Sequence, residues 1–105
     1  MKAEDLLVPL KENLAVEHDA DDALLLRCLS SAASYAEGYQ KKGPDYYQTN
    51  EMTDSTKQAV IVLATFFYES RDGSTAGFFA DSPEAAKQVW ETVKLLLQGD
   101  REVIL

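Results

Sequence analysis

The chain has 105 residues, of which 46% are hydrophobic, and its 18 acidic against 10 basic side chains give a formal net charge of −8. This length is sufficient for one domain, residues 1–105, with a single hydrophobic core. The only cysteine, Cys28, excludes an intrachain disulfide and a cysteine zinc site. The acidic balance argues against tight nucleic-acid binding, because proteins that bind phosphates carry basic surfaces.

Residues 1–14 contain acidic side chains where a signal peptide needs an uninterrupted apolar run, so we expect neither export nor membrane insertion. Residues 3–14 instead predict a short amphipathic helix, and its leucines share one face. These leucines are Leu6, Leu7, Leu10 and Leu14. Pro9 has no amide hydrogen and disrupts a helix interior, so the spacing predicts either two short helical pieces or a start near Val8.

A long helix is predicted from about Ala20 to Gln40 and ends at the sequence KKGP of residues 41–44. Carboxylates at its start suit the exposed amides and the helix dipole, which indicates a capping role for Asp19, Asp21 and Asp22. An apolar stripe recurs at helical spacing. It consists of Leu25, Cys28, Leu29, Ala32, Ala36 and Tyr39. Further apolar side chains widen this surface, which indicates contact with the first helix or with another subunit.

Residues 56–71, TKQAVIVLATFFYESR, form the predicted central helix, because this segment is apolar on all sides. Its apolar part, Ala59 to Tyr68, is far shorter than the roughly 20 residues that a membrane span needs. The β-branched run also fits a strand, but the polar flanks extend the segment to helix length without a breaker. We therefore predict a buried helix, with Asp54 or Ser55 as its N-cap.

Two long loops adjoin the central helix, and each carries an aromatic pair. Tyr46 and Tyr47 lie in residues 45–53. They either fold back over the core as a lid or contact another protein, since tyrosine is common in both settings. Phe78 and Phe79 lie in residues 72–81 and are either core residues or a docking anchor.

A last helix is predicted from Pro83 to Gln98, with Ser82 as N-cap and Gly99 as its end. Its apolar stripe consists of Ala86, Val89, Trp90, Val93, Leu96 and Leu97. The sequence therefore predicts an all-α fold, a small bundle of about four helices around a central buried helix (residues 56–71), with two long loops.

The chain ends in three apolar residues, Val103, Ile104 and Leu105. These are either tucked into the core or offered to a partner protein.

Motifs of known chemistry are absent from the sequence. His18 is the only histidine, and no phosphate-binding glycine loop or nucleophile-elbow motif occurs. The acidic residues after His18 lack the spacing of a calcium-binding loop, so helix capping explains them better. We therefore expect no catalytic residue, no metal and no cofactor, and we predict that the protein is not an enzyme.

Three stretches in order resemble the head-to-tail connector proteins of long-tailed double-stranded DNA phages. Residues 10–19 begin LKENL and resemble the family's L-K-x-x-L-x-V-x-x-x-x-D, and residues 21–39 resemble its D-D-x-L-x-x-x-I-x-x-A-x-x-Y-x-E-x-Y helix. Residues 57–71 resemble its K-Q-A-I-L-L-L-x-A-x-x-Y-E-x-R helix. The last helix departs from the family's L-L-x-P-Y-R ending, because residues 96–100 read LLQGD.

The resemblance implies a structural subunit that forms a homo-oligomeric ring below the portal, joins it to the next connector or the tail, and lets DNA pass without binding it specifically. It implies a location in the virion, and in the bacterial cytoplasm before assembly or when expressed from a prophage, with no membrane partner. The candidate subunit-interface residues are Tyr46, Tyr47, Phe78, Phe79, Val103, Ile104 and Leu105. The candidate channel-facing residues are Asp19, Asp21 and Asp22.

Two other classes of function stay open at this point. The first is a small helical adaptor or regulatory protein that binds one partner without forming rings, which the assembly state would distinguish. The second is metal-assisted chemistry at His18 with the three aspartates that follow it, which a calorimetric metal titration would detect.

Overall fold

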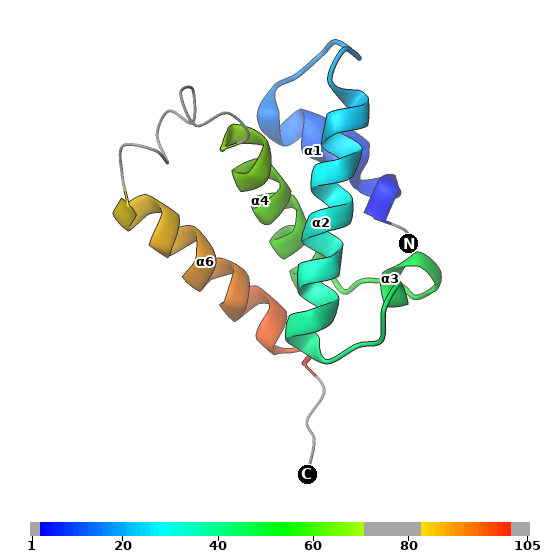
Figure 1. Ribbon diagram of the computed structural model, residues 1–105, viewed down its shortest axis with the longest axis vertical. Coiled ribbons are helices and arrows are strands. Elements are labelled where there is room, and N and C mark those ends of the chain that lie inside the picture. The colour runs from blue at the N-terminus through cyan, green and yellow to red at the C-terminus, as the bar shows by residue number, and fades with distance from the viewer. Residues whose placement is uncertain (1–2, 71–82, 102–105) are drawn as a thin grey trace.

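The computed structural model describes residues 3–70 and 83–101, and within these ranges all regular secondary structure is helical (Figure 1). In chain order the elements are the 3-10 turn η1 (Ala3–Leu6) and the helices α1 (Leu7–Leu14), α2 (Asp22–Gln40), α3 (Tyr46–Thr49), α4 (Asp54–Glu69) and α6 (Pro83–Gln98). The predicted all-α fold is confirmed. Several candidate interface residues lie outside the described ranges, so the structure tests no interpretation of them. These are Phe78, Phe79, Val103, Ile104 and Leu105.

The central helix of the bundle is α4, which packs against α1, α2 and α6 (Figure 1). It begins at Asp54, and its N-cap is Thr53 instead of the predicted Asp54 or Ser55. The Thr53 hydroxyl accepts a hydrogen bond of 3.3 Å from the amide of Thr56, which is the usual role of an N-cap side chain. The helix ends at Glu69, and the predicted end at residue 71 lies outside the described ranges.

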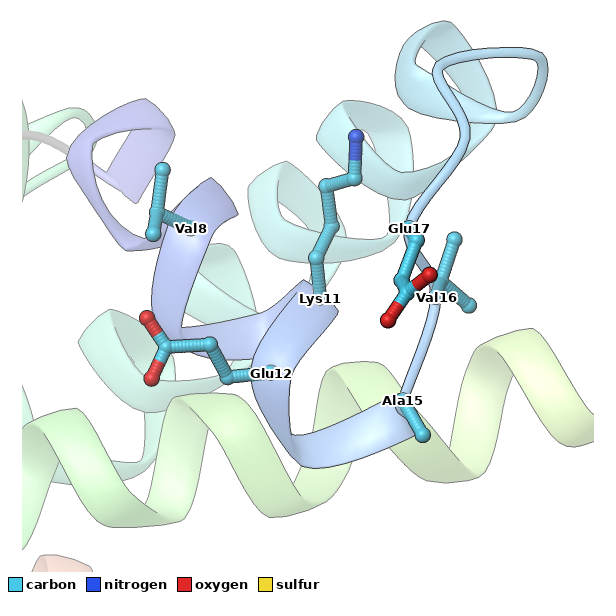
Figure 2. A pocket seen from close by; sticks show the side chains of 6 residues that line it. All are labelled: Val8, Lys11, Glu12, Ala15, Val16 and Glu17. Atoms are coloured by element: carbon cyan, nitrogen blue, oxygen red, sulfur yellow. The ribbon is translucent and has the colours of Figure 1, made fainter.

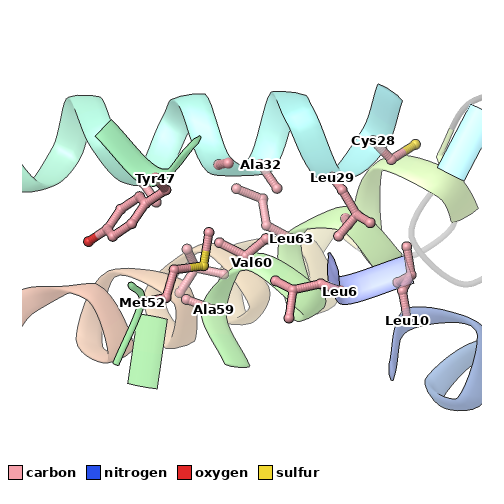
Figure 3. Close-up of a cluster of buried hydrophobic side chains, with 14 of the residues drawn as sticks. Leu6, Leu10, Cys28, Leu29, Ala32, Tyr47, Met52, Ala59, Val60 and Leu63 are labelled. Atoms are coloured by element: carbon pink, nitrogen blue, oxygen red, sulfur yellow. The ribbon is translucent and has the colours of Figure 1, made fainter. Parts of the chain in front are cut away.

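One contiguous hydrophobic core lies between the helices, and Figure 3 shows part of it. Its buried residues are Leu6, Leu10, Leu25, Cys28, Leu29, Ala32, Ala33, Ala36, Tyr47, Met52, Ala59, Val60, Leu63, Ala64, Val93 and Leu97. The predicted stripes of α1, α2 and α6 all face this core. Each fully buried leucine or valine stabilises the fold by roughly 1.5–3 kcal/mol relative to an exposed one, so these stripes hold the bundle together.

Pro9 lies in the first turn of α1, because η1 ends at Leu6 and the α-helix begins only at Leu7. Amides of the first helical turn have no intrahelical acceptor, so a proline there removes no backbone hydrogen bond. A 3-10 turn followed by an α-helix that begins at Leu7 agrees with both predicted alternatives, two short helical pieces and a start near Val8.

Two helices end in a left-handed residue that is not glycine. The amides of Lys41 and Lys42 donate to the carbonyls of Gly38 and Glu37 at 3.3 and 2.9 Å, and Lys41 has φ = 64°. Helix α1 closes in the same way at Ala15, where φ = 57°. Such Schellman closures favour glycine at the left-handed position, because a side chain is strained there.

Candidate functional site

A buried polar network joins four helices at the end of the bundle where α2 stops and α4 starts. Gln40 is fully buried, and its Nε2 donates to Thr56 Oγ1 at 2.9 Å and to the Leu97 carbonyl at 3.1 Å. Its Oε1 accepts a hydrogen bond of 2.5 Å from the Tyr47 hydroxyl. Because the amide group has partners at both ends, the network ties α3, α4 and α6 to α2 without leaving a costly buried polar atom. The sequence alone did not indicate this role for Gln40.

The network continues to the surface at Asp100, just beyond α6. The Thr56 hydroxyl donates to Asp100 Oδ2 at 2.7 Å, and the Thr53 hydroxyl donates to the same oxygen. The carboxylate thus links the chain after α6 to the N-cap of α4. This contact orients the end of α6 relative to the central helix.

The two adjacent tyrosines occupy different environments, in a segment that was predicted as a loop but contains the single-turn helix α3. Tyr47 is 3% exposed, and its amide donates to Glu37 Oε2 at 2.9 Å. Tyr46 is half-buried, and its ring meets the Tyr47 ring edge-on with 5.0 Å between the ring centroids. The Lys42 ammonium lies over the Tyr46 ring, 5.0 Å from its centroid. Burial raises the pKa of the Tyr47 hydroxyl. Tyr47 therefore has the position of a lid over the core, whereas Tyr46 keeps some accessible ring surface.

The acidic residues at the start of α2 make tertiary contacts, and Asp22 lies in the first helical turn as predicted. Asp21 is the N-cap residue, but its side chain accepts no capping hydrogen bond and instead accepts one of 2.5 Å from the Tyr68 hydroxyl. Lys11 Nζ lies 2.8 Å from both Asp19 Oδ1 and Asp22 Oδ1. The hydrogen bond and charge of Lys11 lower the pKa of Asp19, and the two carboxylates raise the pKa of Lys11. The Asp19 side chain nevertheless stays 87% exposed.

The structure also locates His18 and the other metal-binding side-chain types. His18 Nδ1 accepts a hydrogen bond of 3.3 Å from the Ala20 amide. In residues 3–70 and 83–101, no three histidine, cysteine, aspartate or glutamate side chains gather as metal ligands would. No helix in the same two ranges has both the length and the apolar character to cross a membrane.

An aromatic cluster fastens α6 to its neighbours. The Trp90 ring lies 5.1 Å from Tyr35 on α2, and 5.8 and 6.4 Å from Phe66 and Phe67 on α4, measured between centroids. All four side chains are half-buried. Edge-on and tilted aromatic pairs of this kind each add roughly 0.5–1.5 kcal/mol beyond area burial. The cluster thus positions α6 while leaving aromatic surface accessible between the helices.

Taken together, these observations define a small all-helical protein whose polar and aromatic side chains make contacts between helices. The family model described as Phage gp6-like head-tail connector protein matches residues 4–95, and the chain therefore belongs to this family of structural phage proteins. The match confirms the family that residues 10–71 resemble and extends it through most of α6. Neither curated proteins nor solved structures give a significant match.

Proposed function

We propose that this chain is a subunit of a homo-oligomeric ring at the capsid vertex, which joins the portal protein to a downstream connector or tail protein and lets DNA pass through its hole. Membership of the connector family over residues 4–95 is the observation that carries this proposal. The role is structural and involves no catalysis or cofactor. The subunit acts in the virion, after synthesis in the bacterial cytoplasm from an infecting phage or a prophage.

The charge distribution supports passage of DNA without attachment. A net charge of −8 repels the duplex, since tight DNA binding needs a basic surface. We retain Asp19, Asp21 and Asp22 as channel-facing candidates. Asp19 is the best placed of the three because its side chain is 87% exposed. All three have partners within the subunit, since Lys11 binds Asp19 and Asp22 and the Tyr68 hydroxyl binds Asp21.

The candidate subunit-interface residues differ in how much surface they offer. Tyr46 is half-buried and can contact a neighbour through its open side, whereas Tyr47 has little surface left. Phe78, Phe79, Val103, Ile104 and Leu105 remain interface candidates on the basis of the sequence. Exchanging Phe78 and Phe79 for serine should abolish assembly and leave helicity intact, whereas loss of folding would place the pair in the core.

Native mass spectrometry over a concentration series, with and without purified portal rings, tests the proposal. A single closed oligomer, formed alone or on the portal, is the expected result. A chain that stays monomeric in both series and does not bind the portal would overturn the connector role. That result would favour an adaptor that binds one other protein.

A further inference from the structure

The outer face of α6 carries an apolar side chain that the fold does not use. Leu95 is 71% exposed, whereas Val93 and Leu97 on the opposite side of the helix are fully buried. At 100° per residue, Leu95 falls near the centre of the outward face. Glu84 and Glu91 lie within about 40° of Leu95 on this face, and Lys87 and Lys94 flank it at about 80° and 100°. Among the described residues, Lys87 and Lys94 have no ion-pair partner.

A hollow of about 430 Å³ lies beside α1 and the connector that follows it (Figure 2). Its lining residues are Val8, Lys11, Glu12, Ala15, Val16 and Glu17. Its apolar surface includes Val8, which is 64% exposed.

The charges around the hollow favour a basic partner. Lys11 is held by Asp19 and Asp22, so its charge is compensated within the subunit. Glu12 and Glu17 are exposed, and no other described residue pairs with them. The hollow therefore combines an apolar surface with two uncompensated carboxylates. A complementary partner would present an apolar side chain next to a lysine. The apolar side chain would cover the apolar surface of the hollow, and the lysine would neutralise Glu12 and Glu17.

Helix α4 packs between α6, which carries Leu95, and α1, which borders the hollow (Figure 1). A head-to-tail ring joins two different faces of the same chain, and an exposed apolar side chain that matches a pocket elsewhere on the molecule makes such a contact. We infer that Leu95 of one subunit inserts into the Val8–Val16 hollow of the next copy, with Lys94 against Glu12 and Glu17. This inference rests on the proposed ring, and it names the two surfaces that close it.

Engineered disulfides and charge reversal test this contact directly. In a Cys28→Ala background, the double variant Val16→Cys, Leu95→Cys should form a ladder of covalent multimers under mild oxidation, while each single-cysteine variant stops at a dimer. Leu95→Ser and Lys94→Glu should each raise the concentration needed for half-assembly by about tenfold or more. Adding Glu12→Lys and Glu17→Lys to Lys94→Glu should restore assembly. Leu26→Ser is the matched control, because Leu26 is 36% exposed on α2 and lies outside the contact.

The outcomes separate this contact from the ring itself. If the unaltered protein forms rings but the double-cysteine variant gives no ladder and Lys94→Glu assembles normally, the named contact is wrong while the connector role stands. If no ladder forms and no oligomer appears even with portal rings, both the contact and the ring are overturned. A ladder that disappears in Lys94→Glu and returns with the compensating glutamate exchanges supports the inference.

Discussion

The Nε2 of Gln40, near the end of α2, donates a 2.9 Å hydrogen bond to Thr56 Oγ1 in the first turn of α4, and both residues are fully buried. The same side chain binds Leu97 and Tyr47. One amide therefore satisfies groups from three other helices. Removing this amide should therefore destabilise the contacts of α2 with α3, α4 and α6 together.

Exchanging Gln40 for leucine should lower the free energy of unfolding by about 2–4 kcal/mol, because buried donors and acceptors on three helices lose their hydrogen-bond partner. Urea unfolding followed by circular dichroism measures this loss. Gln58→Leu is the matched control, since Gln58 is exposed on α4 and the same chemical change there should alter stability by less than about 0.5 kcal/mol. Equal effects in the two variants would contradict the role assigned to the network.

Tyr47 should make the protein less stable in alkali. Because burial raises its pKa, the unfolded chain ionises first, at about pH 10, and stability is then lost as pH rises toward the folded pKa. Tyr47→Phe should cost roughly 1–3 kcal/mol at neutral pH, since Gln40 Oε1 loses its donor, and should reduce the alkaline loss. Urea unfolding at neutral and alkaline pH checks both effects. Tyr46→Phe leaves the hydrogen bond in place and should keep the alkaline loss.

Two opposite exchanges near the end of α2 should each stabilise the protein. Lys41→Gly removes the strain of a side chain on a left-handed backbone with φ = 64°. It should raise the free energy of unfolding by about 0.5–1 kcal/mol after the entropy cost of glycine. Gly38→Ala replaces a poor helix former with a good one, in a position where an added Cβ meets no atom within 4 Å, and should add a similar amount. Thermal unfolding measures both changes. Lys41→Ala keeps the strain and should give no gain.

Lys11→Met should flatten the dependence of stability on pH at both ends. The lowered pKa of Asp19 contributes stability above about pH 4 that is lost as pH falls through the folded value. The raised pKa of Lys11 contributes stability below about pH 10.4 that is lost as pH rises through the folded value. Urea unfolding from about pH 3 to about pH 11 tests this. Lys57→Met, which removes only a 3.9 Å exposed pair with Asp54, should leave the profile unchanged.

The type and approximate position of each long helix follow from the sequence alone, although α2 begins at Asp22 and α4 at Asp54, each two residues from the predicted start. Apolar residues at steps of three and four identify the buried faces of α1, α2 and α6, and the KKGP and Gly99 stops mark where helices end. These signals are local, because helical spacing and capping involve residues within a few positions of each other. The connector family is also recognisable at this level, since its motifs lie along single helices.

Local patterns did not reveal which polar and aromatic groups find partners. Adjacent tyrosines 46 and 47 have similar sequence contexts, yet only Tyr47 is buried, because the turn of α3 directs it onto the core. The exposure of Leu95, by contrast, can be read from the sequence, because this leucine interrupts the polar side of the α6 pattern.

The sequence by itself thus determined the long helices, their buried faces and the family. Only the tertiary structure decided that Gln40 donates to the carbonyl of Leu97, 57 residues away, and that the side chain of Asp21 accepts from Tyr68 instead of from a helix amide. It also decided that α4 packs between α6, which carries Leu95, and α1, which borders the hollow. The physical reason is that helical periodicity fixes which side of each helix is apolar, while the partner of each polar group depends on how distant helices are packed together.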